Sequence, residues 1–253
     1  MIDTRQLVDR LHTIESVAWI SRVGSTNAVA RRIMAECIEN ELALPQAILI
    51  AGEQLAGSGR NQRSWSSPRD KGIYATAMLM RPPEELPLLP LEIATAVAVY
   101  LREVFGVDAR IKWPNDILVG GKKIAGILIE ARIQESRAFL LIGIGINVIR
   151  HAHDAAAATS IDETARRDFR GIDDAVVRFV EHLDARLSHT RQRELILDEW
   201  RSLTVHKPGD PVSCVIGERT ISGTWTGIDE QGRALLMKDQ ELVPVSAGDL
   251  ILL

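Results

Sequence analysis

The chain has 253 residues, of which 46% are hydrophobic and 25% are charged, and its formal net charge is −4. This composition is typical of a globular chain long enough for a main domain and a smaller one, and it argues against disorder. The net negative charge argues against a protein whose main surface binds nucleic acid, because proteins that bind phosphates usually have a basic face. The most apolar run, 139–149, is shorter than the ~18 residues of a membrane-spanning helix, and the N-terminus has no apolar signal core. We therefore expect a cytoplasmic protein.

The first 204 residues alternate helix and strand patterns. Helices are expected at about 4–13, 25–40, 86–106, 172–189 and 191–203, and strands at 17–23, 46–53, 72–80, twice within 109–133, and at 138–149. Ser25 or Thr26 can cap the second helix, and the dipeptide Gly120-Gly121 suits a tight hairpin turn. The stretch 151–170 is expected to be irregular. The pattern predicts a mixed, largely antiparallel sheet with helices beside it.

From Val205 onward the chain switches to short β segments separated by glycines and acidic turns. This predicts a small C-terminal β-barrel, with a domain boundary between 1–204 and 205–253. The two cysteines, Cys37 and Cys214, fall on opposite sides of that boundary, so we expect packing residues rather than a disulfide or a thiolate metal site.

One loop concentrates positive charge in this acidic chain. The stretch "GSGRNQRSWSSPRDKG", 57–72, holds three glycines, four cations and a tryptophan. Glycines let backbone N–H groups approach an anion, arginines supply planar fork donors, and Trp65 offers an aromatic face. The loop lacks the lysine of a P-loop, and "GIGINV" lacks the third glycine of a dinucleotide fingerprint. The residues of this loop fit both an anion-binding site and a solvated surface loop.

A second cluster of cations flanks "WPND". The chain has 30 basic residues but only six lysines, and Lys112, Lys122 and Lys123 fall within twelve positions. Lysine is a compact point charge that can follow charge developing on phosphorus. For Lys122, at the hairpin tip, we favour a solubility role, whereas Lys123 lies on the strand side and is a candidate functional residue. "WPND" itself can also be a simple turn.

Taken together, the motifs "GSTN", "GSGRNQRSWSSP", "KWPND", "GKKIAGILIE" and "GIGINV", in this order, resemble the biotin protein ligase family. The likeness runs from about Val17 to Asn147, and the C-terminal segment resembles the small SH3-like barrel of that family. The resemblance implies an α+β fold: a class II synthetase-like catalytic domain with a mixed, largely antiparallel sheet and flanking helices, followed by the barrel.

The resemblance also implies a two-step reaction. Biotin and MgATP give biotinyl-5′-AMP, and the biotinyl group then passes to a lysine of biotin carboxyl carrier protein, a subunit of acetyl-CoA carboxylase. The biotin carboxylate is itself the nucleophile, so the enzyme has to position the reactants and stabilise negative charge. This agrees with a sequence that has clustered cations and no Ser-His-Asp set.

Site residues follow from the same resemblance. Arg60 and Lys123 match the catalytic cations. The residues matched to biotin binding are Ser25, Thr26, Asn27, Gln54, Gly57, Ser58, Gly59, Arg60 and Lys123. Those matched to ATP and the adenylate are Arg60, Trp65, Lys112, Asn115, Asp116 and Asn147. Asp116 is also a candidate partner for Mg²⁺ through water.

Two positions depart from the family's usual G-R-G-R-x-G-R loop. Ser58 replaces the first arginine, and Gln62 replaces the later glycine. The loss of a cation predicts weaker retention of the adenylate, and the loss of a glycine predicts a stiffer loop.

Other functions remain alternatives at this stage. A lipoate or octanoate protein ligase shares the superfamily, although "KWPND" and the barrel favour biotin. A non-catalytic biotin-binding regulator is a second alternative, with Ser58 and Gln62 as signs of lost chemistry. Some relatives double as DNA-binding repressors, but the serine-threonine pair at residue 25 leaves no room before it for a helix-turn-helix unit, so we expect no DNA binding. A homodimer is expected from the resemblance alone.

Overall fold

The computed structural model describes residues 3–151, 156–167, 169–188 and 191–252, without the side chains of Gln62 and Leu252. Its α-helices are α1 (Thr4–Val8), α2 (Thr26–Glu39), α3 (Leu89–Phe105), α4 (Ile161–Thr164), α5 (Ile172–Leu187) and α6 (Arg193–Leu203). Its strands are β1 (Ser16–Ile20), β2 (Ala47–Ala51), β3 (Gly72–Arg81), β4 (Arg110–Lys112), β5 (Asp116–Val119), β6 (Lys122–Gln134), β7 (Arg137–Asn147), β8 (Pro211–Ile216), β9 (Arg219–Ile228), β10 (Ala234–Lys238), β11 (Glu241–Val245) and β12 (Asp249–Leu252).

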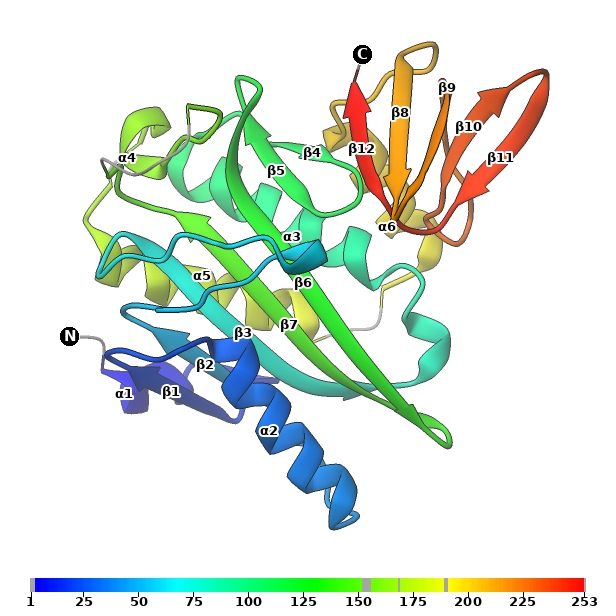
Figure 1. The fold of residues 1–253 in the computed structure, drawn as a ribbon. Coiled ribbons are helices and arrows are strands. Elements are labelled where there is room, and N and C mark those ends of the chain that lie inside the picture. The colour runs from blue at the N-terminus through cyan, green and yellow to red at the C-terminus, as the bar shows by residue number, and fades with distance from the viewer. Residues whose placement is uncertain (1–2, 152–155, 168, 189–190, 253) are drawn as a thin grey trace.

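The larger sheet has seven strands in the order β1-β2-β3-β7-β6-β5-β4. Only the β1–β2 pair is parallel, and every other neighbouring pair is antiparallel. The prediction of a mixed, largely antiparallel sheet is therefore confirmed. Figure 1 shows α2 in front of this sheet and α3 and α5 behind it, while the cyan segment between β2 and β3 crosses in front of β7 and β6.

The central strand β7 presents two different surfaces because side chains alternate along a strand. Ile142, Ile144 and Ile146 are at most 3% exposed and pack into the core shared with α3 and α5. The intervening residues Gly143 and Gly145 face the other side, where α2 covers only part of the sheet. That uncovered area of the sheet holds the candidate site.

Most predicted elements are present, with some changes at their ends. Helix α3 ends at Gly106, whose φ of 66° suits glycine, and the hairpin between β5 and β6 turns through Gly120 and Gly121, both with positive φ. Helix α1 is shorter than predicted and ends at Val8, and the irregular stretch 151–170 contains the short helix α4. The strand β4 is an addition to the two strands predicted within 109–133.

The C-terminal segment forms a second sheet of five strands in the order β11-β10-β9-β8-β12, which confirms the predicted SH3-like barrel. The final stretch, predicted as one β segment, forms two strands, because β12 crosses over to pair with β8. The barrel contacts the main sheet through the indole of Trp113, whose Nε1 donates to the Gly232 carbonyl at 3.1 Å.

Both cysteines are free and buried, as expected for packing residues. In the parts of the chain that the structure describes, no helix combines the length and the apolar character needed to cross a membrane.

Candidate active site

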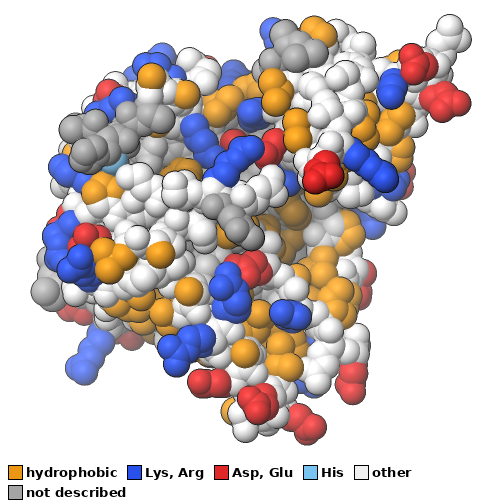
Figure 2. Space-filling model, in the orientation of Figure 1, with side chains coloured by type: hydrophobic (Ala, Val, Ile, Leu, Met, Phe, Trp, Pro, Cys, Tyr) orange, Lys and Arg blue, Asp and Glu red, His pale blue; other side chains and the backbone are white. Residues whose placement is uncertain are grey.

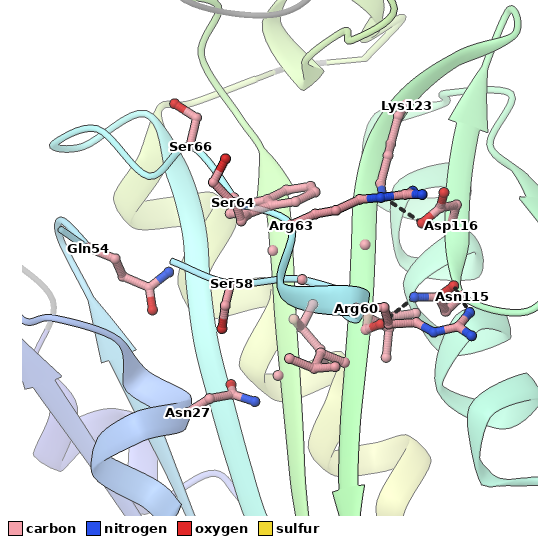
Figure 3. A pocket seen from close by; sticks show the side chains of 18 of the residues that line it. Asn27, Gln54, Ser58, Arg60, Arg63, Ser64, Ser66, Asn115, Asp116 and Lys123 are labelled. Carbon is pink, nitrogen blue, oxygen red and sulfur yellow. Dashed lines mark hydrogen bonds and ion pairs between the residues drawn. The ribbon is translucent and has the colours of Figure 1, made fainter. Parts of the chain in front are cut away.

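A cavity of about 400 Å³ opens on the face of the seven-stranded sheet that α2 leaves uncovered. Its walls come from the start of α2, the segment between β2 and β3, the β5–β6 hairpin, β7 and the first residue of β12. Figure 3 shows neutral side chains, among them Asn27, Gln54 and Ser58, at one end and Arg60, Asn115, Asp116 and Lys123 at the other. The cavity therefore has a neutral polar end and a cationic end.

The floor between the two ends is made of glycine. A Cβ at Gly143 would lie 2.3 Å from Asn27 Oδ1, and a Cβ at Gly145 would lie 2.5 Å from Cε2 of Trp65. A Cβ at Gly126 on β6 would lie 3.1 Å from both Trp65 and Lys123. The glycines of "GIGINV" and "KKIAGIL" thus let side chains lie directly on the sheet, which any larger residue would prevent.

At the neutral end, Gln54 joins the start of α2 to the loop that follows β2. Its Oε1 accepts from the Thr26 backbone N–H at 2.8 Å and lies 3.1 Å from Thr26 Oγ1, while its Nε2 donates to Ser67 Oγ at 3.0 Å. Helix α2 begins after Ser25 as predicted, but the Ser25 side chain makes no capping hydrogen bond. Gln54 instead supplies an acceptor for the helix N-terminus, and Ser25 lines the cavity.

At the cationic end, Lys123 pairs with Asp116. The Nζ–Oδ1 distance is 2.6 Å, and Lys123 Nζ also lies 5.3 Å from the Trp65 ring centroid. The backbone of Lys123 is held as well, because its N–H donates to the Ala157 carbonyl at 2.8 Å and its carbonyl accepts from Thr159 N–H at 2.9 Å. A partly exposed ion pair of this kind adds little stability, but it keeps a cation in place beside the cavity.

Arg60 is oriented by the turn of "WPND". Its Nη1 donates to Asn115 Oδ1 at 3.0 Å, and Asn115 Nδ2 donates in turn to the Ile127 carbonyl at 2.6 Å. The amide of Asn115 is therefore fixed from one side by the sheet and holds the guanidinium from the other. This gives "WPND" a specific role that a simple turn would not have.

The basic loop is a short hairpin over the cavity. Gly59 N–H donates to the Arg63 carbonyl at 2.8 Å, and Trp65 N–H donates to the Gly57 carbonyl at 2.9 Å. At the tip, Arg63 forms an ion pair with Asp249 of β12 at 2.5 Å, and Asn61 donates to the same carboxylate at 3.3 Å. The loop is thus attached to the C-terminal barrel, and Figure 2 shows basic and acidic side chains gathered where the two sheets meet.

Trp65 lies over the glycine floor near Lys123. Its Nε1 is buried and has no hydrogen-bond partner in the structure. A buried indole N–H normally finds an acceptor, but this one lies against Gly145, where a Cβ would come within 2.6 Å of the nitrogen.

The described residues contain no cluster of three or more His, Cys, Asp or Glu side chains that could hold a metal ion. Asp116 is the carboxylate of "WPND" itself, and it is already paired with Lys123. A single carboxylate can serve Mg²⁺ only together with water and phosphate oxygens, as when the metal arrives bound to a nucleotide.

All but two of the predicted site residues line this cavity. Gly57 lies just behind it, where a Cβ would come within 2.5 Å of the Trp65 carbonyl, so this glycine allows the hairpin to close. Lys112 lies opposite Asp116 in the backbone pairing of β4 with β5, but its side chain does not line the cavity. The side chain of Gln62 is outside the described residues. The lining also includes residues that were not among the predicted site residues, among them Arg63, Ser64, Ser66, Ala157, Ala158 and Asp249.

Comparison with known proteins agrees with this geometry. The model of the biotin/lipoate A/B protein ligase family matches residues 20–147. The bifunctional ligase/repressor BirA of Bacillus subtilis is 31% identical, over 84% of this chain and 68% of its own length. The biotin–[acetyl-CoA-carboxylase] ligase of Mycobacterium tuberculosis is 31% identical, over 99% of this chain and 95% of its own.

Among solved structures, the biotin protein ligase of Aquifex aeolicus in complex with biotin and ATP superimposes with a TM-score of 0.73 at 26% identity. The match covers 93% of this chain and 97% of that one. Sequence motifs, fold and cavity therefore agree, and the chain belongs to the biotin/lipoate A/B protein ligase family, among its biotin protein ligases.

Proposed function

We propose that this protein activates biotin with MgATP to biotinyl-5′-AMP and transfers the biotinyl group to a lysine of biotin carboxyl carrier protein. The observation that carries the proposal is one cavity with two unlike ends. A neutral, hydrogen-bonding end suits the ureido ring of biotin, and a cationic end suits a carboxylate and a phosphate.

In the first step, a carboxylate oxygen of biotin bonds to the α-phosphorus of ATP, the bond to the β-phosphate oxygen breaks, and pyrophosphate leaves. Negative charge spreads over the phosphoryl oxygens during this exchange. Arg60 and Lys123 stand at that end of the cavity, each held by a neighbour, Asn115 and Asp116 respectively. Fixed cations stabilise such charge without reorganising during the reaction.

In the second step, the amine of the acceptor lysine attacks the acyl carbon, the bond to the phosphate oxygen breaks, AMP leaves and the amine gives up a proton to solvent. Until then, the mixed anhydride has to be kept from water. The hairpin at 57–65 covers the cavity and is attached to the barrel through Asp249, so it can retain the adenylate.

We further propose that residues 1–204 form the catalytic domain and 205–253 the barrel domain, and that the protein acts in the cytoplasm as a homodimer. Mg²⁺ is proposed to enter with ATP, near Asp116. The oligomeric state is measured directly by light scattering at several protein concentrations.

The test is the intact mass of a purified apo carrier domain incubated with this protein, MgATP and equal amounts of biotin and lipoate. A single biotinyl addition, abolished by Arg60→Ala or Lys123→Ala, would support the proposal. A lipoyl addition would contradict it and favour a lipoate ligase. Pyrophosphate release without any addition would support the first step and contradict the acceptor, and no reaction in either assay would favour a binding protein.

A further inference from the structure

Asn27 lies between the cavity and a charged pair outside it. The side chain is 6% exposed and lines the neutral end. Its Nδ2 donates to Glu130 Oε1 at 3.1 Å, and its Oδ1 accepts from Thr76 Oγ1 at 2.6 Å. Glu130 is on β6, does not line the cavity, and has no role in the function proposed above.

The charge of Glu130 fixes the direction of the Asn27 amide. An ionised carboxylate only accepts hydrogen bonds, so Asn27 has to turn its NH₂ group toward Glu130 and its carbonyl oxygen away. Arg31 holds both carboxylate oxygens, with Nε–Oε2 and Nη2–Oε1 distances of 2.9 Å. The hydrogen bonds from Arg31 keep the pKa of Glu130 below its ordinary value, so the charge persists at neutral pH.

The direction set at Asn27 passes on to Thr76, which is fully buried. The Thr76 hydroxyl has one hydrogen and contacts Asn27 Oδ1 at 2.6 Å and Thr26 Oγ1 at 2.8 Å. Because Asn27 Oδ1 can only accept, the hydrogen of Thr76 points to Asn27. The Thr26 hydroxyl then donates to Thr76, and Gln54 Oε1 keeps the Thr26 backbone N–H as its donor. One carboxylate outside the cavity thus orders the polar groups of the neutral end.

The Asn27 oxygen uses one lone pair for Thr76, and the second is available to a donor in the cavity. Gly143 permits this arrangement, since a Cβ added at that position would lie 2.3 Å from the same oxygen. A cyclic urea offers two N–H donors and one carbonyl. A fixed carbonyl acceptor distinguishes such an N–H from an oxygen or an alkyl group.

We propose that Glu130, clamped by Arg31, is a positioning residue that selects for a ring N–H by locking the Asn27 carbonyl toward the ligand. The inference rests on the proposed function, since it assumes that the ureido ring of biotin occupies the neutral end. A glutamine at position 130 would keep the size but lose the charge. The glutamine could present either its oxygen or its NH₂ group to Asn27. The Asn27 carboxamide could then rotate by about 180° and exchange the positions of its oxygen and its nitrogen.

The experiment is calorimetric binding of biotin and of two analogues in which oxygen replaces one or the other ureido N–H. We expect the wild type to reject the analogue that lacks the N–H facing Asn27 by about a hundredfold. In Glu130→Gln that ratio is expected to fall to about tenfold, and biotin itself to bind about tenfold more weakly. The ratio for the other analogue should stay within about twofold.

Glu135→Gln is the matched control, because it makes the same change in the turn that follows β6, away from the cavity. It should leave all three affinities unchanged. If Glu130→Gln does not fold, Arg31→Gln replaces it, since that side chain is half exposed and its loss removes only the clamp. The same ratio should then fall by about threefold.

A purely structural role for Glu130 would weaken all three ligands equally, and unchanged ratios in the variant would overturn the inference. If the wild type binds biotin and shows no preference between biotin and either analogue, the inference fails while the proposed function stands. Absence of biotin binding to the wild type would overturn both.

Discussion

The two ends of the cavity are prepared for their ligands in different ways. At the neutral end, hydrogen bonds run from Glu130 through Asn27, Thr76 and Thr26 to Gln54, and most of these groups are buried. At the cationic end, Lys123 and Arg63 are paired with Asp116 and Asp249, and their side chains are 35% and 71% exposed. At the neutral end the directions of the hydrogen bonds are fixed, whereas at the cationic end the charges are already partly balanced by carboxylates and by water.

This difference indicates a division of tasks. A ring with few rotatable bonds is best distinguished by donors and acceptors whose orientation is set before it arrives. A phosphate whose negative charge spreads during the reaction is stabilised by cations that are already in place, and this requires charge more than a particular hydrogen-bond direction. We therefore propose that the neutral end determines specificity and the cationic end determines rate, and separate variants can test each.

The largest effect is expected from Lys123→Ala. Removing this cation takes away charge stabilisation and leaves Asp116 uncompensated beside the phosphate. We expect the rate of adenylate formation, followed by pyrophosphate release, to fall by roughly 100- to 1000-fold. Biotin affinity, measured by calorimetry without ATP, should change much less.

Lys122→Ala is the neighbouring control, since Lys122 is exposed at the start of β6 and does not line the cavity. It should retain the wild-type rate. An equal loss in both variants would mean that general positive charge, and not a placed cation, supports the reaction.

The support of the cationic end should be sensitive to acid through His206. Its ring is buried, stacks on Trp225, and accepts the Trp113 backbone N–H on Nε2 at 3.0 Å, while Nδ1 has no hydrogen-bond partner among the described residues. Burial, with a smaller contribution from Lys112, lowers the pKa of His206 from 6.5 to about 4. Protonation would occupy the nitrogen that accepts from Trp113, so the folded state resists it.

The unfolded chain takes up this proton at a higher pH than the folded chain does. The contribution of neutral His206 to the free energy of unfolding should therefore be fully present above pH 6.5 and be lost as the pH drops toward 4. The loss amounts to on the order of 3 kcal/mol. Urea unfolding between pH 7 and pH 4 measures it, and His206→Gln should show a shallower dependence on pH over this window. Parallel curves for the two proteins would assign the acid sensitivity to other groups.

Two glycine variants should separate the ends directly. In Gly143→Ala the new methyl group displaces Asn27, and in Gly145→Ala it displaces Trp65. We expect the first to raise the KM for biotin and the second the KM for ATP, each by about tenfold, as crowding of a packed site usually costs. If each variant raised both constants equally, the two ends would not act separately.

The sequence predicted the strand that carries these glycines and placed "GIGINV" among the defining motifs. It did not predict that Gly143 and Gly145 form the floor, because this depends on Asn27 and Trp65 approaching from other elements. Nor did it identify Asp249, which is 188 residues away from Asn61 along the chain. A local pattern indicates which face a residue occupies, whereas its partner across the fold has no local signature.

The alanines before α4 illustrate the same limit. Ala157 and Ala158 carry no chemistry, yet they line the cavity, and the backbone around them holds Lys123. Gln54 is a single glutamine after a strand, and no local pattern indicates that its carboxamide joins α2 to the loop. Side-chain chemistry can be predicted from residue type, but backbone contacts of this kind require the fold.

The smallest effect is expected from restoring a cation to the hairpin. Ser58 lines the cavity and pairs with Ser64 across the hairpin. At position 58 most members of the family are expected to carry arginine. In Ser58→Arg a fork donor would reach the adenylate phosphate, so the dissociation rate of biotinyl-AMP should fall by about tenfold. Ser58→Gln adds length without charge and should leave that rate unchanged. Equal rates in Ser58→Arg and the wild type would mean that Arg60 and Arg63 already retain the adenylate, and that the serine makes no difference to its escape.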